Sequence, residues 1–161
     1  MSVAYQAIII KCPLREAEEA IESIKRLAPI VPLALADRLT ALILDLPRNE
    51  WAAFECVSSM GCQLSMRFGE AVAVLYNDMV GFRESHVFRN GLHIDSFGAE
   101  SERWVPMNDA GLPEMDHAPL PIEQYPDDAE CECVLTAIEA GLSGIGVHIK
   151  SHDITIAIGA L

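Results

Sequence analysis

Residues 4–28 of the chain read AYQAIIIKCPLREAEEAIESIKRLA and contain the first two elements of the predicted fold. The run Ala4–Cys12 is short, apolar and β-branched, and Pro13 ends it, which is typical of a buried strand. Over Leu14–Ala28, apolar residues recur every three or four positions, and the other face carries acids first and bases last. This order matches the helix dipole, so the stretch predicts an amphipathic helix.

The following residues continue the alternation of strands and helices. Two apolar runs predict a pair of inner strands at Ile30–Ala36 and Leu39–Leu46. A helix is expected over Glu50–Phe68, and a further strand over Ala71–Tyr76. The order β-α-β-β-α-β predicts an α+β domain with the connectivity of a ferredoxin-like sandwich, in which both helices pack on the same face of the sheet.

An extra β-hairpin is predicted next, with strands at Val80–Arg89 and Leu92–Phe97. The intervening Asn90-Gly91 is typical of two-residue hairpin turns, because both turn residues need positive φ. A regular register then sets His86 opposite Asp95. Alternation along both strands places two histidines, two acids and two phenylalanines on one face of the sheet. These residues are Glu84, His86, Phe88, His93, Asp95 and Phe97.

The polar side chains of this face are the candidates for chemistry. Four of them are possible metal ligands, although only as weak candidates: Glu84, His86, His93 and Asp95. Alternatively, His86 acts as a catalytic base oriented by Asp95. Directly opposed Cβ atoms lie ~5 Å apart and diagonal ones ~7–8 Å, so only the His86–Asp95 pair is securely within reach. The simpler interpretation is a solvated face with one His–carboxylate pair, and no metal or other cofactor is expected.

The C-terminal third is predicted to add an irregular acidic excursion and a helix-strand unit. The excursion covers about residues 98–125 and is rich in proline. A helix is expected to begin at Pro126 and run through Gly141, because proline and acids favour a first helical turn. The apolar, β-branched stretch Val147–Ile158 predicts a final strand or hairpin. Residues 1–161 are thus expected to form a single domain.

Charge is the strongest compositional signal. The chain carries −13 in all, yet residues 95–132 hold 11 acids and one base, a net −10. Such a segment repels nucleic acid and anionic membranes and attracts basic proteins. Acids surrounding apolar side chains suit an interface with a charged rim. The predicted binding residues are Glu100, Glu102, Trp104, Met107, Asp109, Glu114 and Asp116. The alternative is a solvated loop that only aids solubility.

Several classes of protein are not expected. The chain has none of the common nucleotide-binding, hydrolase or zinc-protease motifs, and no apolar run of the roughly 18 residues that a membrane span needs. Five cysteines form an odd set without a secretion signal, which favours reduced thiols and a cytoplasmic location. Because no catalytic signature is present, an enzyme is considered less expected than a binding protein.

Residues 72–104, VAVLYNDMVGFRESHVFRNGLHIDSFGAESERW, resemble stretches in small bacterial proteins, some of which are thought to be immunity proteins of toxin systems. The shared elements are a strand, an aromatic-rich hairpin with a central Asn-Gly, and an acidic tail that ends in tryptophan. The resemblance transfers no catalytic residues. Two hypotheses follow: an acidic, immunity-type inhibitor or regulatory adaptor that docks a basic partner, or a small enzyme or small-ligand or metal-binding domain that uses the hairpin face.

Overall fold

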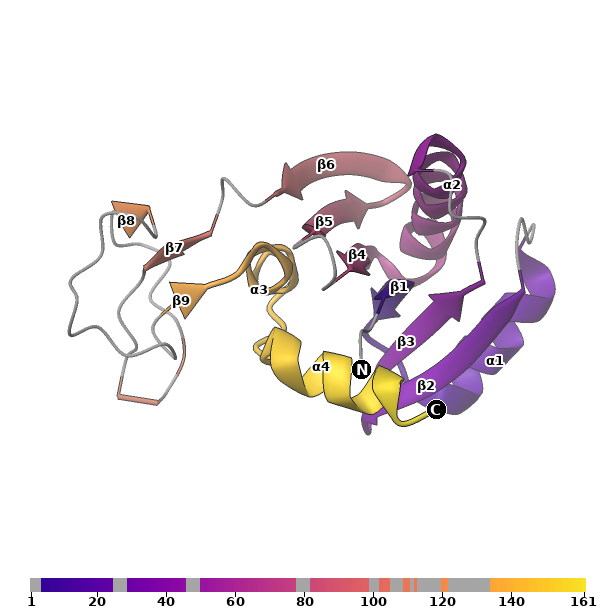
Figure 1. Cartoon of the computed structure of the whole chain (residues 1–161). Helices are drawn as coiled ribbons and strands as arrows, with labels where there is room; N and C mark the ends of the chain where they lie inside the picture. Colours follow the sequence, from indigo (N-terminus) through magenta and orange to yellow (C-terminus); the bar gives the residue numbers. More distant parts are fainter. Residues whose placement is uncertain are drawn as a thin grey trace.

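A six-stranded antiparallel sheet forms the centre of the computed structural model (Figure 1). The structure describes residues 4–24, 29–45, 50–77, 82–98, 102–104, 109–110, 112, 120–121 and 134–161. Across the sheet the strands follow the order β2-β3-β1-β4-β5-β6. Their bounds are β1 Ala4–Ile10, β2 Ile30–Ala36, β3 Leu39–Leu44, β4 Glu70–Asn77, β5 Phe82–Arg89 and β6 Leu92–Phe97.

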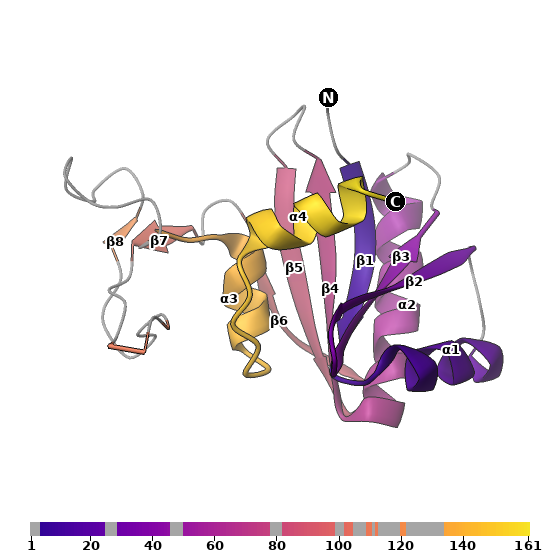
Figure 2. The same cartoon turned by 90° about the horizontal axis from the view of Figure 1, so that it is seen from below.

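In the described part of the chain, four helices cover the two faces of this sheet (Figures 1 and 2). Helices α1 (Leu14–Ser23) and α2 (Glu50–Phe68) share one hydrophobic core with the sheet. Helices α3 (Ala137–Ser143) and α4 (Ser151–Gly159) share the core on the opposite face. The predicted mixed α+β class, the order of the first six elements and the placement of α1 and α2 on one face are therefore confirmed.

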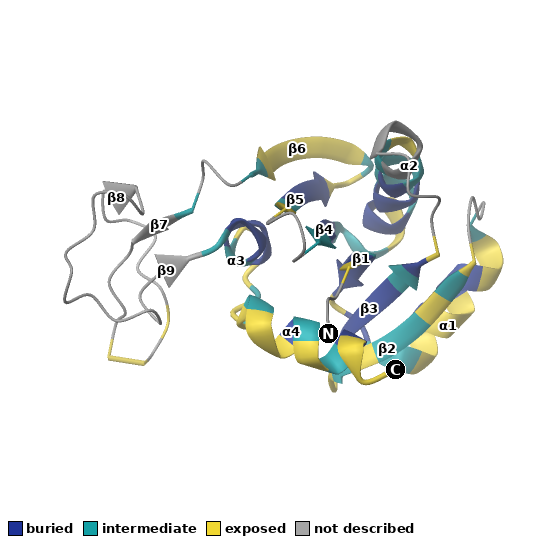
Figure 3. Ribbon diagram, viewed as in Figure 1, coloured by how far each residue is buried: buried dark blue, intermediate teal, exposed yellow. Residues whose placement is uncertain are grey.

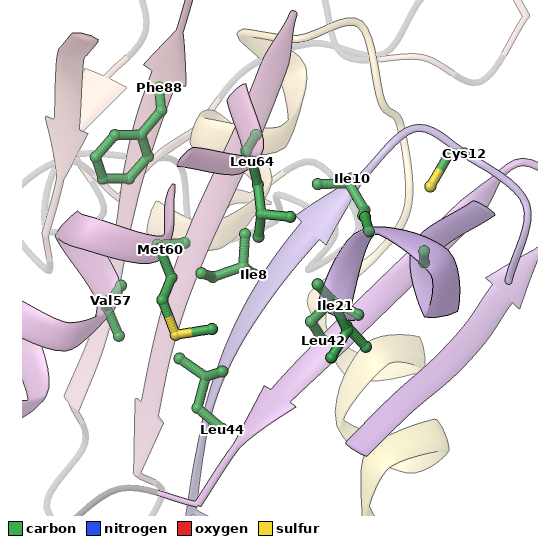
Figure 4. Close-up of a cluster of buried hydrophobic side chains, with 14 of the residues drawn as sticks. Ile8, Ile10, Cys12, Ile21, Leu42, Leu44, Val57, Met60, Leu64 and Phe88 are labelled. Atoms are coloured by element: carbon green, nitrogen blue, oxygen red, sulfur yellow. The ribbon is translucent and has the colours of Figure 1, made fainter. Parts of the chain in front are cut away.

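Strand β1 explains why the sheet accepts helices on both sides. Ile8 and Ile10 point into the core beneath α1 and α2 (Figure 4), whereas Ala7 and Ile9 belong to the core beneath α3 and α4. Successive strand side chains point to opposite faces, so a strand covered on both sides must be apolar throughout. The central strands β1, β3 and β4 are accordingly buried over most of their length (Figure 3).

The C-terminal end of the chain differs from its predicted structure, because Val147–Ile158 does not form a strand or hairpin. Helix α4 occupies most of this stretch and buries Ile154 and Ile158, while Ile156 is 57% exposed. One helical turn brings residues four apart onto the same face, so the first and third isoleucines reach the core. Burial on the sheet thus outweighs the strand preference of β-branched residues.

The helix predicted from Pro126 to Gly141 is also shorter than expected. Val134–Leu135 is strand β9, and α3 begins only after Thr136. The Thr136 hydroxyl accepts a hydrogen bond from the Glu139 backbone N–H at 3.2 Å, which is the contact of a helix N-cap. The predicted start, Pro126, lies outside the described residues. The predicted helix-strand unit is therefore a short strand followed by two helices.

Three short strands form a second sheet beside the main one (Figures 1 and 2). Its order is β8-β7-β9, with β7 at Arg103–Trp104 and β8 at Leu120–Pro121. The predicted excursion at 98–125 thus contains two short strands, and most of its other residues lie outside the described part of the chain. Among the described helices, none has the length and apolar character that a membrane span requires.

Candidate functional site

The hairpin turn between β5 and β6 is the tight turn that the sequence predicts. Asn90 has φ of 50° and Gly91 has φ of 84°, and Arg89 pairs with Leu92. The Gly91 backbone N–H donates a hydrogen bond to the Ser65 hydroxyl at 2.9 Å. This contact joins the turn to helix α2, so the hairpin is held against the helix as well as within the sheet.

A β-bulge then changes the register of the hairpin. Phe88 still pairs with His93, but Val87 pairs with Asp95 and His86 with Ser96. The extra residue, Ile94, moves everything beyond it to the opposite face of the sheet. The predicted His86–Asp95 pair is therefore wrong. Asp95 instead lies opposite Val87, on the face that α3 and α4 cover. Phe97 packs against the hydrophobic core on that same face.

Three of the four candidate metal ligands remain together on the α2 face. Nε2 of His86 lies 2.5 Å from Oε1 of Glu84, and Nδ1 of the same ring lies 3.1 Å from Nε2 of His93. Nε2 is therefore in contact with the Glu84 carboxylate, while Nδ1 shares a hydrogen bond with His93. We call this continuous carboxylate–imidazole–imidazole arrangement of Glu84, His86 and His93 the histidine chain.

Burial distinguishes the histidine chain from the solvated face that the sequence predicts. His86 is only 4% exposed, while the Glu84 side chain is 31% exposed and His93 is exposed. Helix α2 covers His86, with the ring of Phe54 edge-on at a centroid distance of 5.0 Å. The predicted exposure is therefore wrong at His86, and Phe54 joins the site although periodicity indicated only a core position for it.

The position of helix α2 depends on a glycine. A Cβ on Gly61 would lie 2.7 Å from the ring of Phe88, so only glycine lets the helix come this close. The ring of Phe88 in turn stacks on His93 at a centroid distance of 5.1 Å. The two histidines are thus fixed by aromatic rings from β5 and α2.

The electrostatics of the site favour a neutral His86. Burial lowers the pKa of His86 from its ordinary value, and the nearby Glu84 offsets this only in part. A neutral imidazole has one N–H and one lone pair, and the carboxylate beside Nε2 favours placing the proton there. Nδ1 then presents its lone pair toward His93. Nδ1 is thus the acceptor of the hydrogen bond shared with His93, and a cation can bind to it in place of that bond.

The predicted binding residues of the acidic segment are placed only in part. The Glu102 side chain is 14% exposed and lies 3.4 Å from Arg83, so its charge is paired within the molecule. Asp109 is exposed, and Trp104 lies in β7. The remaining predicted binding residues lie outside the described part of the chain: Glu100, Met107, Glu114 and Asp116.

Two of the described cysteines, Cys12 and Cys62, have thiols that burial makes less reactive. Burial raises the pKa of Cys12 to about 11 and also raises that of Cys62. A thiol needs a lowered pKa to react as a thiolate near neutral pH. Cys12 therefore behaves as the small core residue that the sequence predicts.

Neither a metal-binding arrangement of three or more of the described side chains nor a similarity to known proteins identifies the function of this site. Among the described residues, no group of three or more His, Cys, Asp or Glu side chains is arranged to hold an ion. Comparison of the chain with protein-family models, curated proteins and solved structures finds no match. The function is therefore argued from the chain's own charges and contacts.

Proposed function

We propose that the chain is a non-enzymatic binding module that docks a basic partner protein through its acidic segment, residues 95–132. An immunity-type inhibitor or a regulatory adaptor would act in this way. The charge distribution carries the proposal: the segment has a net charge of −10, which leaves only −3 for the rest of the chain. A field this concentrated steers and orients a partner of opposite sign.

The location of the described part of the segment supports this role. Strands β7 and β8 lie in the small sheet beside the main one, away from both hydrophobic cores (Figure 1). In the chain between these two strands, Asp109 and Leu112 are exposed, so the segment presents both acidic and apolar surface. Long-range attraction depends on the total charge of a region more than on the exact placement of each carboxylate.

Glu102 provides an internal control for the proposal. Its carboxylate is paired with Arg83 and largely covered, so it adds little to the outward field. The docking charge is assigned instead to Glu100, Asp109, Glu114 and Asp116, with Trp104 and Met107 as the apolar centre. The same proposal has the protein in the cytoplasm with reduced thiols, and without nucleic acid as a partner.

The test compares two variants that lose the same number of charges. One neutralises the docking acids, with Glu100→Gln, Asp109→Asn, Glu114→Gln and Asp116→Asn. The matched control neutralises four exposed acids elsewhere, with Glu16→Gln, Glu18→Gln, Glu22→Gln and Glu55→Gln. A partner captured from cell extract with the wild-type chain is then bound to each variant by surface plasmon resonance over a range of salt concentrations.

The docking variant should associate at least tenfold more slowly than the wild type, with a smaller change in dissociation. Salt should slow the wild type in the same way, since screening shortens the Debye length from ~8 Å at physiological ionic strength to ~3 Å at 1 M. The control and Glu102→Gln should keep most of the association rate. Equal effects of both four-residue variants, or no effect of either, would contradict docking through this segment.

A second candidate function is small-ligand or metal binding, or small-molecule catalysis, at the hairpin. The observation in its favour is the histidine chain, which joins Glu84, buried His86 and exposed His93. Asp95, which the sequence predicts as its fourth member, is not part of this candidate because the bulge turns it away.

The fold is also proposed to belong to the ferredoxin-like class over its first six elements. The support is the strand order β2-β3-β1-β4, in which each neighbouring pair is antiparallel. This arrangement follows from two interleaved β-α-β units with α1 and α2 on one face. An experimental structure with β1 at an edge of the sheet would contradict this assignment.

A further inference from the structure

We propose that His86 and His93 bind a divalent first-row transition ion such as Zn²⁺, through Nδ1 of His86 and Nε2 of His93. Glu84 serves as the carboxylate that orients His86 from behind. This inference deepens the second candidate function and does not depend on docking by the acidic segment. It rests on the geometry of the histidine chain.

The separation of the two nitrogens suits a shared ion. They lie 3.1 Å apart on neighbouring strands. Two histidine nitrogens bound tetrahedrally to Zn²⁺ at about 2.0–2.1 Å lie ~3.3 Å from each other. An ion takes the place of the hydrogen bond between these two nitrogens, and the exposed His93 ring turns so that both lone pairs face the ion. No movement of the backbone is needed, because His93 is exposed and its ring can adjust.

Glu84 favours the tautomer of His86 that can bind a metal ion, with the proton on Nε2 and the lone pair on Nδ1. Histidines that bind metals usually donate their other N–H to a carboxylate, which fixes the tautomer and raises the basicity of the ligating nitrogen. The Glu84 carboxylate lies on Nε2, on the side of the ring away from His93. An ion on Nδ1 would also polarise the Nε2–H and strengthen its attraction to Glu84.

The surroundings hold one ligand rigidly and leave the other accessible. His86 is buried against Phe54, whereas His93 stacks on Phe88 and faces solvent. Two protein ligands leave further coordination positions for water or for a donor atom of a bound molecule. Imidazole nitrogens favour zinc, copper or nickel over magnesium and calcium. The site is thus of the open kind, with room for an outside ligand.

The test is calorimetric titration of the full chain with ZnCl₂ at about pH 7.5, because metal binding by histidine competes with protons and weakens at acidic pH. The wild type should bind one Zn²⁺ per chain, and MgCl₂ should give no binding heat. His93→Ala should weaken zinc binding at least tenfold, and Glu84→Gln by roughly tenfold or more. His148→Ala and His152→Ala are matched controls at two other exposed histidines and should leave the affinity unchanged.

Two measurements keep the outcome interpretable. Circular dichroism should show that His93→Ala and Glu84→Gln remain folded, because these positions are less buried than His86. In NMR spectra, zinc should shift the ring signals of His86 and His93 and leave those of His148 in place. Absence of saturable zinc binding by the wild type, or full affinity in His93→Ala, would overturn the proposal. No partner protein is used, so failure here is separate from failure of acidic docking.

Discussion

Strand β5 is approached on both faces by a helix, but the two contacts differ in chemistry. On one face, Gly61 of α2 lies against the ring of Phe88; on the other, Gly141 of α3 lies against Ser85. The Ser85 hydroxyl donates a 2.6 Å hydrogen bond to the Ala137 carbonyl of α3. The missing side chain of each glycine thus leaves room for an aromatic ring on the α2 face and lets α3 come close enough for a hydrogen bond on the other face.

The difference between these contacts indicates where chemistry can occur. On the α3 face, the buried hydroxyl of Ser85 is satisfied by the helix backbone and has a structural role. On the α2 face, His86 is also buried, but the hydrogen-bond partner of its Nδ1 is the exposed side chain of His93 and not the helix backbone. A buried polar group whose partner faces solvent is one that a ligand can reach.

The largest losses of stability are expected from substitutions at the two glycines. Gly141→Ala should destabilise the protein by about 3 kcal/mol, because the new Cβ would overlap the Ser85 side chain within a packed interface. Gly61→Ala should cost about 2 kcal/mol, since the flat Phe88 ring can tilt. Urea unfolding measures both changes. Values near zero would mean that neither helix packs this closely on β5.

His86→Ala should destabilise the protein by about 2 kcal/mol. The substitution leaves a cavity beneath α2 and removes the partner of a half-buried carboxylate. His93→Ala serves as the exposed control and should cost less than about 0.5 kcal/mol. A loss below about 1 kcal/mol at His86, measured by thermal or urea unfolding, would instead fit the solvated face that hairpin periodicity predicts.

Ser85→Ala tests the α3 face with a smaller effect. It removes the hydrogen bond that joins Ser85 to the Ala137 carbonyl, which costs about 1 kcal/mol. Combined with Gly141→Ala, it should partly relieve the overlap at Oγ, so the double variant should be more stable than the sum of the single losses predicts. Strict additivity in urea unfolding would show that the two side chains do not meet.

The smallest effect is expected at Glu70, where the α3–α4 connection is tied to the sheet. Its carboxylate contacts Lys11 and Arg89, which also donate to the carbonyls of Ile145 and Gly144. Burial favours a higher pKa for Glu70, but the hydrogen bonds from Arg89 and Lys11 outweigh it and lower the pKa below 4.5. The pairs are partly exposed, so Glu70→Gln should cost less than about 1 kcal/mol at neutral pH.

The pH dependence of this effect has a definite sign. Because the folded-state pKa is the lower one, the contribution of Glu70 is complete above pH 4.5 and is lost as the pH falls through the folded-state pKa. The difference in unfolding free energy between wild type and Glu70→Gln should therefore shrink on acidification toward pH 3. A difference that stays constant between neutral and acidic pH would show that the ion pairs do not contribute.

Local rules account for much of the fold. The apolar run Ala4–Cys12 and the three-to-four spacing from Leu14 onward are properties of neighbouring residues, and they predict a buried strand and a helix on its face. Asn90-Gly91 predicts the turn for the same reason, since positive φ is a requirement of the two residues themselves. Charge is likewise additive along the chain, so the acidic segment is visible without coordinates.

Other features depend on residues far apart in the chain. Whether Ile154, Ile156 and Ile158 form a strand or a helix depends on which of them the sheet can bury. The bulge at Ile94 arises where β6 pairs with β5, and no local signal separates it from regular alternation. His86 is buried because Gly61 and Phe54 bring α2 over the hairpin. Contacts of this kind are set by packing between elements. The site therefore differs from its prediction even though the hairpin turn was predicted correctly.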